Sequence, residues 1–308
     1  MLTIRLALIF DSILRTMLLH SSRLVIKPVG WTKVIAALCL LDIFAVEPCS
    51  AQEIVIKNGQ KIAVLGDLVT RWDATDYPQQ VIRGLEANGI HVGLIHVGCM
   101  GTTDKMLGIL DEKVIAQKPD WMILNCGIDD AWGNRTTDQY IKDITRIVEK
   151  TEAAGIKVVL SIATMVGEDP DSHYNGIIAA YNTALRQQAR EKKWLLADFD
   201  MPAALVAAGG GAKTHRSSGL LTNGTVFLNP MGNELLVLAI LRTLGLDTAQ
   251  IQKARDSWLD RTDLCKAKAA LTVRQNEQLA ALAAKEKRPA SEVLGEMVAK
   301  ALAACPQQ

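Results

Sequence analysis

From Lys61 to Asp247, short apolar runs alternate with longer amphipathic segments. The apolar runs predict strands at 61–66, 90–95, 120–125, 156–163 and 193–197. The segments between and after them predict helices at 103–116, 136–154, 174–191 and 230–244. An earlier helix is expected from a cap of Asp76 with Gln79 to the stop at Asn88-Gly89. Strands and helices in regular alternation predict a parallel sheet with helices on both faces.

The composition supports one globular domain of fair size with a smaller addition. The chain has 308 residues, of which 49% are hydrophobic and 22% charged, with a formal net charge of +1. A chain of this length and composition buries a substantial core and is not disordered. A net charge near zero provides no long-range attraction for nucleic acid, so we expect no nucleic-acid partner.

Residues 1–51 are typical of a signal peptide or leader. Lys27 and Lys33 precede the apolar run "VIAALCLLDIFAV", which leads to the small residues "CSA" and predicted cleavage after Ala51. The run is short for a bilayer span and is interrupted by Asp42, so we expect no stable membrane span after cleavage. The predicted location of the mature protein is therefore secreted or periplasmic.

Two further parts follow the leader. Residues 52–247 contain the alternating pattern, and 248–308 form a helical extension rich in Ala, Lys, Gln and Glu that Pro289 interrupts. This extension either packs on the domain or serves in association. In an oxidising compartment Cys265 could pair with Cys305, whereas Cys99 and Cys126 are expected to be buried thiols.

The ends of the first three predicted strands carry the residues of chemical interest. Open α/β sheets bind ligands outside the carboxyl ends of their strands. At these ends the sequence has "GDL" at 66–68, "GCMG" at 98–101 and "CGIDD" at 126–130.

These blocks, with "LLTNGTVFLNPMGN" after them, make the chain resemble the SGNH (GDSL) hydrolase family over roughly 54–247. The surrounding "KPDWMILNCG" and "ATMVGEDP" agree, and the entry "NGQKIAVLGD" is similar to a secreted bacterial branch. The resemblance implies a three-layer α/β/α sandwich of SGNH or flavodoxin-like type, with five parallel strands in the order 2-1-3-4-5. It also implies an ester hydrolase, often acting on acylated carbohydrates, and we expect no cofactor.

The family's functional positions are altered in this chain. Carried over by motif, the nucleophilic serine falls on Leu68, the oxyanion glycine on Gly101 and the oxyanion asparagine on Asp129, while the aspartate and histidine fall on Gly224 and Phe227. Without serine no acyl-enzyme forms, and in a comparable hydrolase its loss costs about 10⁶-fold in turnover. A carboxylate at the asparagine position would repel the developing oxyanion.

Three alternatives for this site remain open. Cys99 with His96 could replace the serine mechanism, and His215 lies on a polar loop that could approach the site. Asp67, Asp129 and Asp130 could hold Mg²⁺ or Ca²⁺, although the simpler interpretation is that Asp67 and Asp130 bond to backbone, so no metal is assigned.

The third is an apolar plug, in which Leu68 meets Phe227. The candidate ligand cleft consists of Asp67, Leu68, Gly101, Asp129, Asp130 and Phe227, with Trp72 and Trp132 as candidates for carbohydrate contact.

The preferred functional hypothesis is a catalytically defective relative of acyl esterases that binds an acylated carbohydrate or a small ester. One alternative is an active ester hydrolase with a non-standard nucleophile or a metal. The other is a structural or interaction protein that acts through its C-terminal helices.

Overall fold

The computed structural model describes residues 55–70, 77–98, 101–207, 219–223, 226–259 and 273–303. The chain divides into two units at Ala51, and all of these residues belong to the second unit, Gln52–Gln308. The predicted leader, Cys99, His215, Gly224, Cys265, Cys305, Trp72 and the Asp76 cap lie outside the described residues.

A five-stranded parallel sheet forms the centre of the domain. Its strands are β1 (Lys61–Gly66), β2 (Gly93–Gly98), β3 (Trp121–Asn125), β4 (Lys157–Ser161) and β5 (Leu195–Ala197). Their order is β2-β1-β3-β4-β5, which confirms the predicted order. The apolar positions of β1 and β3 are fully buried, as expected of central strands covered on both faces.

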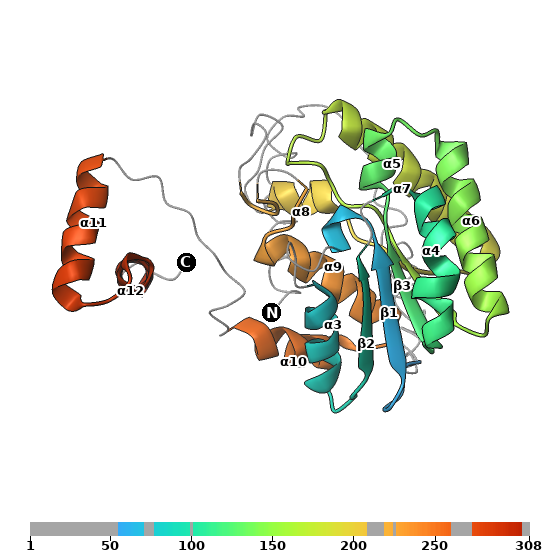
Figure 1. Cartoon of the computed structure of the whole chain (residues 1–308), viewed down its shortest axis with the longest axis horizontal. Coiled ribbons are helices and arrows are strands. Elements are labelled where there is room, and N and C mark those ends of the chain that lie inside the picture. Colours follow the sequence, from blue (N-terminus) through green and yellow to red (C-terminus); the bar gives the residue numbers. More distant parts are fainter. Residues whose placement is uncertain are drawn as a thin grey trace, which may run out of the picture. The chain divides into compact units, whose positions relative to one another are not determined.

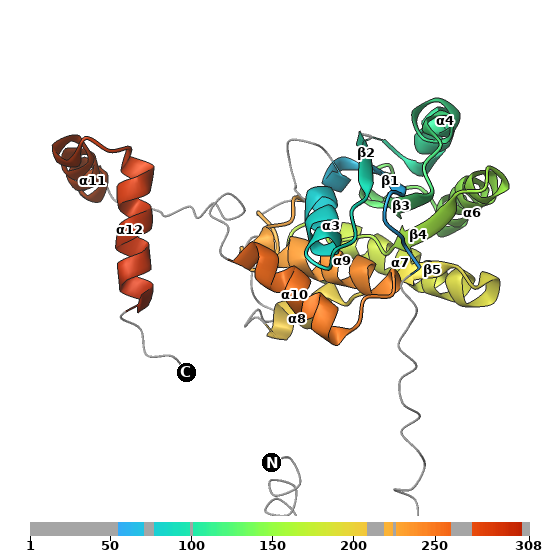
Figure 2. The ribbon, with the colours of Figure 1, turned by 90° about the horizontal axis from the view of Figure 1, so that it is seen from below.

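Helices cover both faces of the sheet and produce the expected three layers (Figures 1 and 2). On one face α3 (Tyr77–Glu86) packs against α9 (Pro230–Thr243) and α10 (Thr248–Leu259). On the other face α6 (Thr137–Ala153) contacts both α4 (Thr103–Lys113) and α7 (His173–Lys192).

Shorter elements complete the domain: η1 (Leu68–Thr70), η2 (Ile115–Gln117), α5 (Ile128–Trp132) and α8 (Met201–Ala207). In the extension, α11 (Val273–Glu286) and α12 (Ala290–Ala303) contact each other on either side of Pro289. Among the described residues, no helix has the length and apolarity needed to cross a bilayer.

The second strand was predicted three residues too early. Ile90 belongs to the turn that closes α3, because its N–H bonds to the carbonyl of Leu85 at 3.0 Å. Pairing with β1 then begins at Gly93, opposite Lys61, and ends at Gly98, opposite Gly66. The apolar run 90–95 therefore predicted a strand correctly, whereas the helix-ending turn determined where it begins.

Smaller differences concern helix ends. The helix predicted at 103–116 ends at Lys113, and the separate turn η2 follows it, closed by Lys118 in the left-handed conformation. Helices α5 and α8 were not predicted, since five and seven residues are too few for a clear periodic pattern.

Candidate functional site

The carboxyl end of β1 is a tight turn that only glycine can begin. A Cβ atom on Gly66 would lie 2.0 Å from Thr70 Oγ1 and 2.4 Å from the carbonyl oxygen of Asn125. The turn continues through Asp67 into η1, where Leu68 is 7% exposed and belongs to the hydrophobic core. At the position where the family resemblance implies a nucleophile, the structure therefore has a core side chain.

Asp67 links the ends of two strands. Its carboxylate is fully buried and accepts hydrogen bonds from the backbone N–H of Val69 and of Ile128, each at 3.0 Å. Burial, with a smaller effect of the nearby carboxylates of Asp129 and Asp130, raises the pKa of Asp67 to about 7, against the lowering effect of the two N–H groups. Asp67 therefore bonds to backbone N–H groups, as expected from the sequence.

Asp130 has a similar role between α5 and α4. Its carboxylate accepts hydrogen bonds from Thr103 Oγ1 at 2.7 Å and from the Thr103 backbone N–H at 3.1 Å. Arg135 Nε lies 2.9 Å from the same carboxylate, and the guanidinium also pairs with Asp104 and Asp143. Burial raises the pKa of Asp130, while Thr103 and then Arg135 act to lower it.

Asp129 is the residue that most changes the chemistry of the site. The backbone N–H of Gly101 and the charge of Lys105 lie close enough to its carboxylate to favour the ionised form. Partial burial outweighs both and raises the pKa of Asp129. Its Oδ2 atom is buried and makes no hydrogen bond within the part of the chain that the structure describes. Asp129 and Gly101, both predicted site residues, are thus brought together.

For the metal alternative, the residues that the structure describes provide no suitable set of ligands. Asp67 and Asp130 already direct their oxygens at backbone and hydroxyl donors. Across the described ranges, no three His, Cys, Asp or Glu side chains are placed to hold an ion.

For the nucleophile alternative, His96 Nε2 lies 2.5 Å from the Thr70 carbonyl oxygen. Cys126 is buried, and its carbonyl accepts a hydrogen bond from Tyr140 at 3.2 Å.

Glu168 organises the last block of the site, a role that sequence reasoning missed. This buried carboxylate follows β4 and accepts from the backbone N–H of Leu221 at 2.7 Å and of Thr222 at 2.6 Å. A third backbone donor, Leu220, lies 3.3 Å away. The sequence signal was the "GED" within "ATMVGEDP", which carried the resemblance but was given no function.

Phe227 follows this segment and is half-buried against the same hydrophobic core that contains Leu68. Direct contact between the Leu68 and Phe227 side chains stays a prediction. Trp132, at the end of α5, is 40% exposed, which leaves part of its ring available near Asp129.

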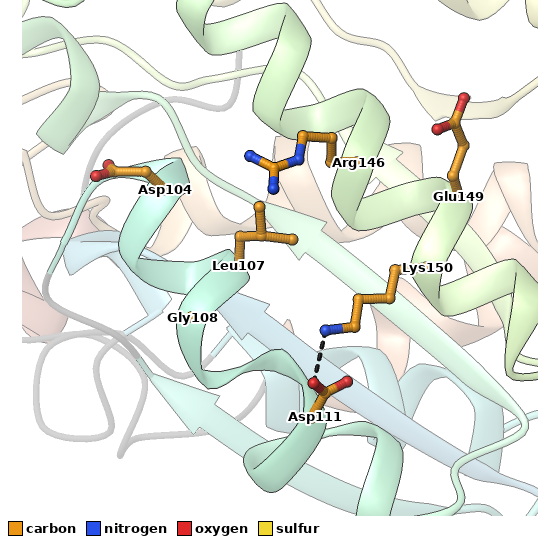
Figure 3. Close-up of a pocket in the computed structure, with 7 residues that line it drawn as sticks. All are labelled: Asp104, Leu107, Gly108, Asp111, Arg146, Glu149 and Lys150. Carbon is orange, nitrogen blue, oxygen red and sulfur yellow. Dashed lines mark hydrogen bonds and ion pairs between the residues drawn. The ribbon is translucent and has the colours of Figure 1, made fainter.

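One cavity is a groove elsewhere on the domain. It has a volume of about 770 Å³ and lies between α4 and α6, where Lys150 pairs with Asp111 at 2.6 Å (Figure 3). None of the six residues of the candidate ligand cleft lines it. A second cavity of about 180 Å³ lies beyond β4, beside α7 and α8, with Met165, Asn182 and Phe199 among its lining residues.

Comparison with known proteins identifies similar sequences and folds. The sequence profile of the GDSL-like lipase/acylhydrolase family matches residues 64–235, more than half of the chain. A search of curated proteins found no match.

Among solved structures, the acetylxylan esterase Axe2 from Geobacillus stearothermophilus is 21% identical with a TM-score of 0.53, covering 63% of this chain and 97% of Axe2. LAE5, an alpha/beta hydrolase enzyme from the metagenome of Lake Arreo in Spain, is 18% identical with a TM-score of 0.53, covering 62% of this chain and 98% of LAE5. At these identities the likeness concerns the fold.

Proposed function

The chain belongs to the GDSL-like lipase/acylhydrolase family, and from that membership we propose that it binds an acylated carbohydrate or a small ester without cleaving it by a serine mechanism. The binding site is the carboxyl ends of β1 and β3 with the last block beside them. The ligand class follows the family and the fold shared with Axe2, an acetylxylan esterase. The loss of hydrolysis follows from the residues at the site.

The nucleophile is the first missing part. Leu68 stands at the position that serine has in the family, and its side chain has no hydroxyl and is 7% exposed. No acyl-enzyme can form on such a residue. The tight turn that holds this position is nevertheless intact, because Gly66 and Asp67 keep their contacts with Thr70, Asn125 and Ile128.

The contact between Asp129 and Gly101 is the observation that carries the proposal. In the family both positions donate hydrogen bonds to the oxyanion, whereas here position 129 is a carboxylate that lies close to the Gly101 N–H. One of the two donors is thereby replaced by an acceptor, which lies beside the other. Removal of a single oxyanion donor costs about 10²–10³-fold in turnover, so this arrangement opposes hydrolysis independently of Leu68.

A sugar ring has an aromatic surface available at the same edge of the sheet. Trp132 ends α5, three residues after Asp129, and its side chain is 40% exposed. Carbohydrate and small-molecule sites commonly combine such rings with a few polar groups. A predicted leader ending at Ala51 would place this site outside the cytoplasm, where acylated polysaccharides occur.

Two measurements test the proposal. The purified chain should hydrolyse p-nitrophenyl acetate no faster than a heat-inactivated sample. Robust turnover that Leu68→Ala leaves unchanged would contradict the proposal. Its loss on Cys99→Ser would then support a cysteine nucleophile, and its loss on chelation would support a metal.

Binding is measured by calorimetry with acetylated xylo-oligosaccharides, using the deacetylated sugars as the matched ligand. We expect binding that Trp132→Ala weakens by about tenfold or more, because it removes the exposed ring. Trp194→Ala is the control, since Trp194 comes just before the amino end of the edge strand β5, whereas the proposed site lies at the carboxyl ends of β1 and β3. Absence of binding to either ligand would argue against a ligand-binding role.

A further inference from the structure

Beyond ligand binding, we propose that α11 and α12 form a helical hairpin that pairs with the same hairpin of a second copy of the chain, producing a four-helix bundle. The proposal concerns the described residues 273–303 and does not depend on the chemistry of the strand-end site. It rests on how little the hairpin buries by itself, on the width of its apolar surface and on its balanced charge.

The hairpin alone has almost no core. Of its apolar side chains, Ala283 is 6% and Val293 is 2% exposed, and these are the buried hydrophobic residues that the structure describes in 273–303. Each helix has 14 residues, a length at which isolated helices are marginal in water. Two buried side chains do not offset the conformational entropy lost by ordering both helices, so a further apolar contact is required.

The apolar surface of α12 is wider than one neighbouring helix can cover. Ala290, Val293, Leu294, Met297 and Val298 follow the i, i+3, i+4, i+7, i+8 spacing of a broad apolar face. Val293 is buried, whereas Met297 and Val298 remain 52% and 41% exposed. A face of this width is typical of helices in a four-helix bundle, where each helix has two neighbours.

The charged residues of the hairpin are compatible with a second copy. Arg288 pairs with Glu296 at 2.7 Å and Glu296 with Lys300 at 2.6 Å, so these charges are satisfied within the hairpin. Residues 273–303 contain five basic and four acidic side chains. This near-neutral balance avoids repulsion between two identical hairpins and lacks the basic excess typical of helices that bind anionic membranes.

The chain's own domain offers a poorer apolar partner within its described residues. Its exposed large hydrophobic side chains there are Trp132, Val206, Met231 and Leu259, one on each of four helices. Single exposed apolar residues are normal on a soluble surface, whereas a docking site requires a continuous patch. The apolar face of the hairpin in a second copy provides such a continuous patch.

The experiment is to measure the molar mass of the full chain by light scattering across a dilution series. We expect a dimer, and we expect Met297→Glu combined with Val298→Glu to raise its dissociation constant by about a hundredfold or more. Val273→Glu is the matched control, because Val273 is 79% exposed at the start of α11 and lies outside the apolar face of α12. This control should remain dimeric.

Thermal unfolding of the domain is followed in the same samples, so that loss of association is distinguished from loss of the fold. A chain that is monomeric at every concentration would overturn the proposal, as would a dimer that survives the double substitution. Binding of the monomer to phosphatidylserine vesicles, abolished by the same double substitution, would instead identify a membrane surface as the partner.

Discussion

The carboxylate of Asp67 accepts a hydrogen bond from the backbone N–H of Ile128 at 3.0 Å and so links the end of β1 to the start of α5. The same carboxylate accepts from Val69 within its own turn. Because both bonds are to backbone, they hold the turn together whatever side chain occupies Leu68. A strand-end turn of this kind can therefore form with an apolar side chain at position 68.

The stability of the fold should fall as pH rises from about 4 to about 7. Burial raises the pKa of Asp67 from 3.8 to about 7, so the folded state retains a proton that the unfolded state releases. The stabilisation is complete below the unfolded pKa and is lost through the folded pKa, with a total of up to about 4 kcal/mol. Asp67→Asn should flatten this dependence, as measured by urea unfolding at several pH values. A wild-type stability that increases over this range would contradict the prediction.

Glu168→Ala should destabilise the protein by about 3 kcal/mol. The substitution leaves the backbone N–H groups of Leu221 and Thr222 without their acceptor in a buried position. Glu168→Gln is the matched variant, since its carbonyl oxygen can still accept from both, and it should cost about 1 kcal/mol. Equal losses for the two variants would mean that the negative charge, rather than the acceptor, stabilises this segment.

Alanine substitutions at two glycines should have opposite effects. At Gly66 the new Cβ would lie 2.4 Å from the Asn125 carbonyl oxygen, which is backbone and cannot move freely, so we expect little folded protein. At Gly176, on the exposed face of α7, an added Cβ would meet no other part of the protein within 4 Å. Gly176→Ala should therefore raise the free energy of unfolding by up to about 1 kcal/mol. Thermal unfolding compares them, and a well-folded Gly66→Ala protein would show that the turn is not close-packed.

The parallel sheet was predictable from the alternation of strands and helices, and the order of its strands followed from the family resemblance of the strand-end motifs. The start of β2 was not predictable, since Ile90 is apolar enough for a strand but is used to close α3. The function of Glu168 also lay beyond sequence reasoning, because its partner Leu221 is 53 residues away. Asp129 was predicted to oppose an oxyanion, but only the structure shows that its carboxylate lies beside the Gly101 N–H.

Restoring the family residues provides the last prediction. Leu68→Ser, Asp129→Asn, Gly224→Asp and Phe227→His together should produce measurable hydrolysis of p-nitrophenyl acetate, because the turn at Gly66 and Asp67 is already built. Asparagine at position 129 would remove the negative charge and restore a side-chain N–H donor.

Two triple variants separate the contributions. Leaving Leu68 in place should return activity to background, since no acyl-enzyme can form. Leaving Asp129 in place should cost about 10²–10³-fold, because the oxyanion would then meet a carboxylate in place of a side-chain donor. An initial burst of p-nitrophenol in the quadruple variant would identify the acyl-enzyme. A folded quadruple variant without activity would mean that these four positions do not correspond to the family's catalytic residues.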